Sequence, residues 1–264
     1  MLIVPPAIVP MGNLVSSCVL DLDATIVDSF VSGETWSNIE PIPGDGSATA
    51  DNDFYMGATG TVDGDEPTLT GTAGDPAAYM LYDGGDQNNF KGTITTFFDS
   101  LHKTTGGSDF TVFIPYYFIS GTAFILFDTR GAGGATVGNI LYNVAGNDRL
   151  YFTQRGTTAP VTRFSTGAVT GSGFNIVGIS HSHSANNTKF WVNSSTAEDV
   201  VHTFNTSTAA ASGVPSLGAY SGGTSPAPSG TRYYGASIFN EYFDDAKARI
   251  VIDQYNARHN RVYA

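Results

Sequence analysis

The amino-acid sequence predicts an all-β protein, and its composition gives three reasons. Charged residues make up 14% of the 264-residue chain, well below the roughly 25% of an average soluble domain. Glu and Lys, which favour helices, occur only 5 and 4 times, whereas Asp occurs 19 times and Gly 31 times, and both of these favour turns. The 17 Phe and 13 Tyr residues are enough to fill a large core. A single β-sandwich is therefore favoured over a helical bundle, a coiled coil or a standard α/β enzyme.

Residues 1–17 are predicted to form an extended arm, ahead of a single sandwich domain over residues 18–264. Three prolines in the first ten residues oppose regular strand pairing. The first ten residues also lack a basic residue and are too short to cross a membrane, so neither a signal peptide nor membrane insertion is expected. An apolar arm must be covered, either by its own domain or by a neighbouring subunit. For docking on a neighbour, the candidate residues are Leu2, Ile3, Val4, Pro5, Pro6, Ile8 and Val9.

From Cys18 onward the pattern changes to short strands separated by turns. Cys18 is the single cysteine, so it cannot form an intrachain disulfide, and it is expected to be a small core residue. Strands are predicted over residues 19–22 and 35–39. Residues 41–76 are dense in Gly, Pro and Asp and are predicted to be loop-rich. The next strand is expected over residues 78–82.

The middle of the chain is its most apolar part. Residues 110–120 and 123–128 are apolar at both odd and even positions, which is typical of strands buried on both faces. Pro115 lacks an N–H donor, so the first of these strands is expected to lie at a sheet edge or to carry a bulge.

Further strands follow at the spacing of about ten residues that a sandwich predicts. A hairpin is expected in which residues 174–180 pair with residues 189–193 through the polar loop between them. Other strands are predicted over residues 140–144, 150–154, 161–165, 216–220 and 235–243.

One helix is predicted, near residues 244–258. Asp244 or Asp245 can cap its N-terminus, and Arg258 and His259 lie at its C-terminal end, where the helix dipole favours positive charge. Its apolar stripe consists of Ile250, Val251 and Tyr255.

The order of these elements resembles the concanavalin A-like, laminin-G-like jelly-roll family. The segments that carry the resemblance are AYMLYDGGDQNNF, FTVFIPYYF with FILFDTRG, FNIVGIS with TKFWVN, and SLGAY with YYGASIFNEYFDDAKARIVIDQYNA. The opening segment SCVLDLDATIVDSFVSGETWSN is similar to the start of such domains in tailed-bacteriophage virion proteins. The resemblance implies a concanavalin A-like jelly-roll β-sandwich. It also implies a non-enzymatic virion protein, either a capsid decoration or a tail component, which docks on other capsid or tail subunits and forms a homo-oligomer.

Two alternatives to the virion interpretation stay open: a carbohydrate-binding adhesin for a host-surface glycan at a tail or fibre tip, and an atypical glycoside hydrolase. Sugar recognition commonly uses an exposed aromatic ring. We expect core packing for most of the candidate rings, which are Trp36, Trp191, Tyr142, Tyr151, Tyr220, Tyr233 and Tyr234.

The acidic charge of the chain argues against two classes of binding partner, nucleic acids and anionic membranes. Residues 1–90 hold 14 Asp or Glu and no Lys or Arg, and the whole chain has a net charge of −12. Nucleic-acid binding needs a basic surface, so no nucleic-acid partner is expected. Attraction to an anionic membrane is disfavoured for the same reason.

No catalytic residues are predicted. Hydrolases of the laminarinase type on this fold carry Glu-x-Asp-x-Glu on one strand, because alternate residues share a face. None of the five glutamates, Glu34, Glu40, Glu66, Glu198 and Glu241, has such partners. Phe243 occupies the position where the second carboxylate would follow Glu241.

No metal site or cofactor is predicted either. Asp and Asn beside Gly can bind Ca²⁺, but they more often make turns and cap their own backbone. The acidic clusters are Asp51 with Asp53, Asp63 with Asp65 and Glu66, and Asp83 with Asp86 and Asn88. His181 and His183 could begin a transition-metal site, but their polar neighbours favour a solvated hairpin end.

Overall fold

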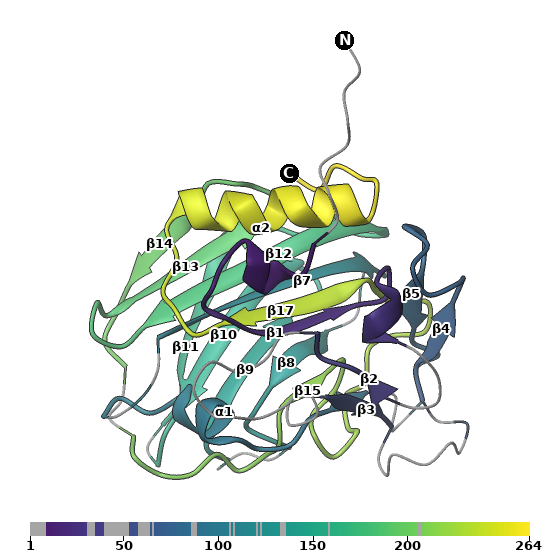
Figure 1. The fold of residues 1–264 in the computed structure, drawn as a ribbon. Coiled ribbons are helices and arrows are strands. Elements are labelled where there is room, and N and C mark those ends of the chain that lie inside the picture. Colours follow the sequence, from purple (N-terminus) through teal and green to yellow (C-terminus); the bar gives the residue numbers. More distant parts are fainter. Residues whose placement is uncertain are drawn as a thin grey trace.

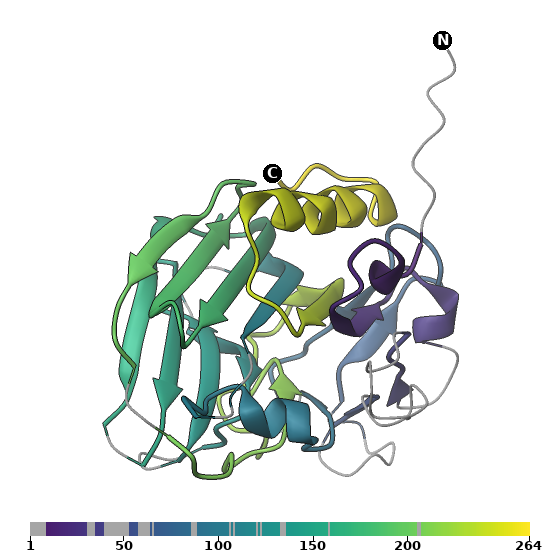
Figure 2. The same ribbon diagram turned by 60° about the vertical axis from the view of Figure 1, so that its left-hand side comes forward.

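The computed structural model confirms the all-β prediction. It describes residues 9–30, 35–39, 53–57, 64, 66–85, 89–105, 107, 109–119, 121, 123–132, 136–157, 159–204 and 207–264. Within these ranges, 17 strands form two antiparallel sheets that pack face to face. Helix α2 (Asp245–Arg258) lies across the outer face of one sheet, and the short helix α1 (Thr96–Ser100) lies on the opposite side of the molecule (Figure 1, Figure 2).

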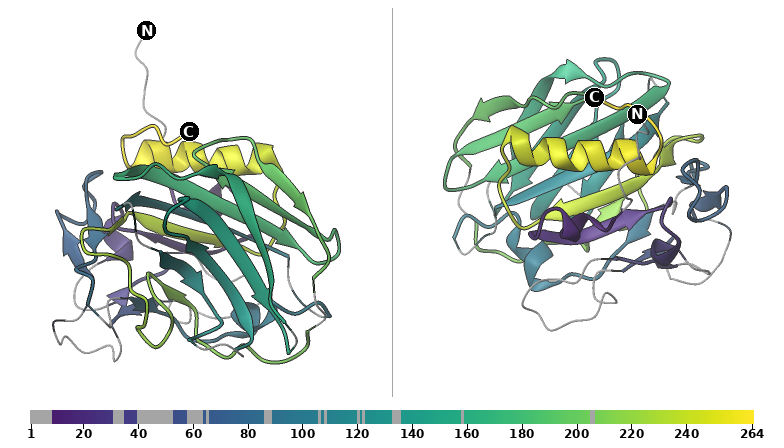
Figure 3. Two further views of the ribbon diagram at one scale, coloured as in Figure 1. Left: turned by 180° about the vertical axis from the view of Figure 1, so that it is seen from behind. Right: turned by 45° about the horizontal axis from the view of Figure 1, so that its top comes forward.

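The first sheet is the one that α2 crosses, as the tilted view in Figure 3 shows. Strand β17 (Gly235–Phe239) branches from its centre, pairing with β7 on one side and with β1 (Cys18–Asp23) on the other. Its main path runs through β14 (Glu198–Val201), β13 (Asn187–Val192), β12 (Gly173–Ser182), β7 (Phe110–Phe118), β16 (Arg232–Tyr233), β5 (Tyr79–Leu81) and β4 (Thr68–Thr70).

The second sheet closes the other side of the sandwich. In spatial order it contains β11 (Val161–Ala168), β10 (Arg149–Arg155), β9 (Gly138–Asn143), β8 (Phe124–Asp128), β15 (Ser216–Leu217), β6 (Phe90–Lys91), β3 (Phe54–Met56) and β2 (Thr35–Trp36).

The main core lies between the two sheets and is rich in aromatic rings. Trp36 is fully buried against Phe90, with ring centroids 4.6 Å apart. Strands β7 and β8 are buried along nearly their whole length, as the apolar segments at residues 110–120 and 123–128 predicted. Burial of such side chains contributes roughly 1.5–3 kcal/mol each.

A second core lies between the first sheet and α2. Phe113 of β7 packs beside Trp191 of β13, with centroids 5.5 Å apart, and beside Phe243 ahead of the helix. Val251 and Tyr255 are buried there, whereas Ile250 is 42% exposed, so the predicted apolar stripe is confirmed in two of its three members. Cys18 belongs to this core, as predicted.

The predicted helix is confirmed at both ends. The Asp244 carboxylate accepts the backbone N–H of Lys247 at 2.9 Å, which makes Asp244 the N-cap. At the other end Arg258 is completely buried. It therefore does more than complement the helix dipole.

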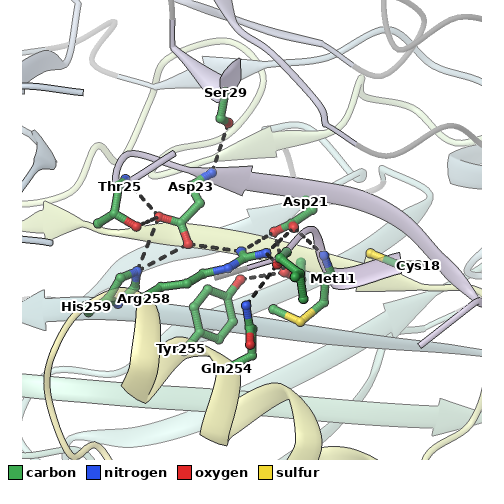
Figure 4. A network of polar contacts seen from close by, with 12 residues as sticks. Met11, Cys18, Asp21, Asp23, Thr25, Ser29, Gln254, Tyr255, Arg258 and His259 are labelled. Atoms are coloured by element: carbon green, nitrogen blue, oxygen red, sulfur yellow. Dashed lines mark hydrogen bonds and ion pairs between the residues drawn. The ribbon is translucent and has the colours of Figure 1, made fainter. Parts of the chain in front are cut away.

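A buried ion-pair network joins the end of α2 to strand β1 (Figure 4). The guanidinium of Arg258 contacts Asp21 through both terminal nitrogens, at 2.7 and 2.8 Å, and Asp23 at 3.1 Å. Burial alone raises the pKa of the Asp23 carboxyl, but His259 and Arg258 outweigh that effect and lower its pKa to about 2. Tyr255 and Ser237 complete the network beside Asp21.

The segment before β1 packs on this network. Residues 11–13 form a 3-10 helix, so the extended conformation predicted for residues 1–17 is wrong there. The carbonyl of Val9 accepts hydrogen bonds from Gln254 at 2.8 Å and Arg258 at 2.7 Å. The amide of Met11 donates to Asp21 at 2.9 Å, and the Met11 side chain is buried (Figure 4).

The position of Pro115 differs from the prediction, because β7 lies in the middle of the first sheet rather than at an edge. On one side Pro115 is paired with Ile176 of β12. On the other side it faces Tyr234, the residue between β16 and β17, whose amide donates to the Pro115 carbonyl at 3.1 Å. The missing N–H therefore falls at a junction between two strands, where the ladder is already interrupted.

Candidate functional site

A patch of aromatic and arginine side chains lies on the outer face of the first sheet, on the part of that face formed by β12, β7, β16 and β5. We call it the Arg–aromatic surface; its residues are Tyr79, Tyr117, Phe174, Arg232, Tyr234 and Arg261. Tyr116 points into the main core, so strand alternation places Tyr117 on the outer face. Across the sheet, Tyr117 is paired with Phe174 on one side and with Arg232 on the other.

Each guanidinium of this surface is held by two rings. The Arg232 guanidinium lies 4.8 Å from the ring centroids of both Tyr79 and Tyr117. Arg261 lies in the segment after α2, and its guanidinium is 4.0 Å from the Phe174 ring and 4.3 Å from the Tyr234 ring. Such cation–π contacts contribute roughly 0.5–2 kcal/mol each. They fix the orientation of two long, otherwise flexible side chains.

The surface is partly open to solvent. Phe174 is 43% exposed, Tyr234 is fully buried beneath it, and the remaining members are half-buried. Tyr117 donates its hydroxyl hydrogen to the Ser172 carbonyl at 2.9 Å, which orients its ring. Val262, which follows Arg261 in the sequence, is 87% exposed.

A polar pocket of about 420 Å³ opens elsewhere and is lined by Thr104, Gly107, Asp109, His183, Ser184 and Asn240. Its size falls in the roughly 300–1,000 Å³ range of ligand pockets. However, both ring nitrogens of His183 are within hydrogen-bonding distance of protein groups, His181 at 3.2 Å and the Leu101 carbonyl at 3.1 Å. His183 is therefore not oriented to act as a general base for Ser184.

His181 and His183 belong to a chain of hydrogen bonds inside the sheet. His181 is completely buried in β12, so the expected solvated hairpin end is wrong for this residue. Its Nδ1 lies 3.1 Å from the Thr188 hydroxyl, which in turn lies 3.0 Å from His202 Nε2. Burial lowers the pKa of all three imidazoles, to about 4 for His202. The described part of the chain contains no group of three or more metal-ligating side chains.

Because the pKa values of these histidines are lowered, we expect them to make the protein less stable in mild acid. Between about pH 6.5 and about pH 4 the unfolded chain binds protons at His202 while the folded chain does not, so the free energy of unfolding decreases as the pH falls. For this residue the loss amounts to about 3 kcal/mol. Asp128 acts in the opposite direction, because burial raises its pKa to about 6.

Urea denaturation of the wild type and of His202→Gln, at about pH 7 and about pH 4, isolates this contribution. The variant should lose less stability on acidification than the wild type. Equal losses in the two proteins would contradict the assignment.

Of the seven candidate aromatic residues, four are buried and three are half-buried. One of the half-buried three is Tyr220, whose hydroxyl accepts a hydrogen bond from Arg130 at 3.1 Å. Trp36, Trp191, Tyr233 and Tyr234 are buried, which confirms the expectation of core packing for most of the set. Tyr142 and Tyr151 are half-buried and form a stripe with Phe164 across β9, β10 and β11. In this stripe the rings pack on one another at 5.1–5.4 Å, with interplanar angles of 30–34°. Their faces are therefore largely occupied by each other.

Three members of the predicted acidic clusters are described, and each accepts a backbone amide. The turn interpretation is confirmed for Asp83 and Glu66, whose partners lie two residues away, whereas the partner of Asp53 lies 15 residues away. Asp83 accepts the amide of Gly85 at 2.8 Å, Asp53 accepts the amide of Asn38 at 2.7 Å, and Glu66 accepts the amide of Gly64 at 2.8 Å. The other members of the predicted acidic clusters lie outside the described residues; they are Asp51, Asp63, Asp65, Asp86 and Asn88.

The glutamates considered for hydrolysis are engaged in protein contacts where they are described. Glu241 accepts the Ser17 hydroxyl at 2.9 Å and is paired with Lys247. Glu198 accepts the amide of Thr166 at 2.6 Å. Phe243, at the position of the missing carboxylate, is buried in the helix-side core. Glu34 and Glu40 lie outside the described residues.

Of the predicted docking residues, only Val9 falls within the described part of the chain, and its carbonyl is bound to α2. The others lie outside it: Leu2, Ile3, Val4, Pro5, Pro6 and Ile8. Docking of these residues on a neighbouring subunit stays a prediction. Within the described ranges, no helix is both long and apolar enough to span a bilayer.

Comparisons with known proteins give matches in structure alone. No protein-family model matches the sequence, and no curated protein does. The binding domain of botulinum neurotoxin serotype D/C superposes with a TM-score of 0.60 at 11% identity, covering 92% of this chain and 52% of that one. Botulinum neurotoxin type C, described as entering cells through interaction with two ganglioside molecules, gives 0.59 at 12% identity, with 94% and 53% covered. The Trypanosoma rangeli sialidase in complex with sialic acid gives 0.57 at 10% identity, with 94% and 35% covered.

These likenesses establish the fold. The chain is an all-β sandwich of the jelly-roll, concanavalin A-like class, as the resemblance in its sequence implied. It spans about half the length of the toxin chains that it matches. The likeness to phage virion proteins stays a prediction from the sequence.

Proposed function

We propose that this chain is a carbohydrate-binding protein and that the Arg–aromatic surface is its glycan-binding site. The observation that carries the proposal is the partly exposed ring of Phe174 among three tyrosines and two arginines. An aromatic ring offers an apolar face to the C–H groups of a pyranose, and nearby polar groups orient its hydroxyls. The structural relatives support a glycan ligand, since cell entry of botulinum neurotoxin type C depends on two ganglioside molecules and the Trypanosoma rangeli sialidase is in complex with sialic acid.

The proposal is for binding without catalysis. It replaces the virion role as our main interpretation, because none of the matches described above comes from a phage particle. The hydrolase alternative has less support than binding, because Glu198 and Glu241 are engaged in hydrogen bonds and Phe243 is buried.

A matched pair of substitutions tests the site. Phe174 on the first sheet and Phe164 on the second are both 43% exposed. We expect Phe174→Ser to weaken glycan binding by about tenfold or more, the effect of losing a central contact residue. Phe164→Ser should leave binding within about twofold of the wild type.

The measurement is a glycan array, followed by calorimetric titration of the best ligand with the wild type and both variants. Loss of binding in Phe164→Ser but not in Phe174→Ser would move the site to the aromatic stripe of the second sheet. An array on which the wild type binds nothing would contradict carbohydrate binding altogether.

A further inference from the structure

The two arginines of the Arg–aromatic surface lack the carboxylate partners that Arg258 and Arg249 have. Arg258 contacts two aspartates and Arg249 contacts Asp253. Among the described residues, by contrast, no ion pair joins Arg232 or Arg261 to a carboxylate. In a chain with a net charge of −12, this leaves two positive charges together on one surface.

The hydrogen-bonding groups of these guanidiniums are also incompletely used. Nε of Arg232 and Nη1 of Arg261 are buried without a hydrogen-bond partner in the described structure. The polar neighbour of Arg261 is the Tyr263 hydroxyl. A guanidinium offers five N–H donors. A ligand cannot reach these two buried atoms, so a ligand with strong acceptors would bind the remaining N–H groups of the two half-buried side chains.

The rings restrict what kind of anion fits. A guanidinium held between two aromatic faces can still offer its edge in the plane between them, and that edge matches a carboxylate through two parallel hydrogen bonds. Phe174 meanwhile offers an exposed apolar ring beside the Arg261 guanidinium. The site therefore combines an apolar platform with a planar cationic fork.

We propose that the Arg–aromatic surface selects glycans whose sugars carry a carboxylate, such as nonulosonic or uronic acids. Arg232 and Arg261 bind the carboxylate, and the exposed face of Phe174 contacts the apolar side of the sugar ring. This inference rests on the proposed carbohydrate-binding function and adds the chemical class of the ligand.

The test compares charged and neutral oligosaccharides by calorimetric titration of the full chain. The probes are a sialylated lactose, an oligogalacturonate, lactose itself and sodium sulfate. We expect at least one acidic oligosaccharide to bind about tenfold or more tightly than lactose and than sulfate. The sialylated and galacturonate arms distinguish a nonulosonic acid from a uronic acid.

Substitution by Met keeps the apolar stem of an arginine against the rings and removes its charge. Arg232→Met and Arg261→Met should each weaken binding of the acidic glycan about tenfold or more and leave any lactose binding unchanged. Arg149→Met is the matched control, because Arg149 also lies over a ring, that of Phe164 on the opposite sheet, at 5.5 Å. It should bind the acidic glycan as the wild type does, and melting curves of all three variants verify their folding.

The outcomes separate the two proposals. Lactose bound as tightly as the acidic glycans, or acidic binding that survives both substitutions, would overturn the carboxylate inference and leave carbohydrate binding standing. Sulfate bound as tightly as the sugars would also overturn it, because the surface would then be a general anion site. If the wild type binds none of the sugars, both proposals are wrong.

Discussion

Replacing Arg258 by Ala is expected to lower the free energy of unfolding by about 3–5 kcal/mol, as measured by urea denaturation at about pH 7. The substitution leaves Asp21 and Asp23 buried without their common cation. It also removes the hydrogen bond to the Val9 carbonyl. The penalty arises mainly from the two uncompensated carboxylates, since a buried charge without a partner is far more costly than a missing contact.

Two comparisons separate this cause from simple loss of packing. Arg249→Ala removes an exposed ion pair on the same helix, with Asp253, and should cost less than about 1 kcal/mol. The triple replacement Asp21→Asn, Asp23→Asn, Arg258→Ala makes the same truncation and removes all three charges, and it should be clearly more stable than Arg258→Ala. Equal instability of these two variants would show that lost packing, and not unpaired charge, causes the effect.

Replacing Trp191 by Ala is expected to cost about 3–5 kcal/mol, the range for deleting a large buried aromatic side chain. Trp191 is 1% exposed and fills the space between the first sheet and α2. Its indole Nε1 donates to Asp245, the first residue of the helix, at 3.0 Å. Its loss leaves a cavity under the start of α2, so hydrogen exchange of the α2 amides should become much faster.

Trp191→Phe is a more conservative substitution at the same position. It keeps most of the apolar volume and removes the hydrogen bond to Asp245, so it should cost about 1 kcal/mol for that bond plus a small packing loss. Trp36→Ala, in the core between the two sheets, should lower the free energy of unfolding by about as much as Trp191→Ala does. It should not selectively expose the α2 amides. If Trp191→Ala leaves exchange in α2 unchanged, the helix does not depend on this contact.

Much of the fold could be predicted from local pattern. Apolar runs located β7 and β8, the polar segment at residues 181–188 located the β12–β13 hairpin, and Asp244 marked the start of α2. These signals succeed because they depend on neighbours within a few residues. Short strands such as β16, with two residues, carry too little pattern to be recognised.

Long-range partnerships could not be predicted. Arg258 was expected only to complement the helix dipole, because nothing near it in the sequence indicates its pairing with Asp21, 237 positions away. Two aspartates inside the apolar run CVLDLD were the available hint of a buried cation. His181 was expected in solvent because its sequence neighbours are polar, but Phe204 and Phe152 cover it.

The candidate site could not be predicted for the same reason: its residues are far apart in the sequence. Phe174 and Arg261 were not recognised as site residues, and Tyr234 was considered only as an isolated ring. The Arg–aromatic surface is assembled from four strands and the segment after α2. No spacing in the sequence brings its members together, whereas sheet pairing does.

The pairing of β1 with β17 also has a consequence for how the chain folds in time. The first strand of the sequence finds its partner in the last strand, and the ion pair that secures it needs the final helix. Contacts between such distant residues form late, because the loop-closure entropy is lost before they stabilise the chain. During synthesis, Asp21 and Asp23 stay hydrated until α2 has left the ribosome. The completed first sheet is therefore a product of late, slow association, and folding of this protein should be measured in milliseconds to seconds or longer.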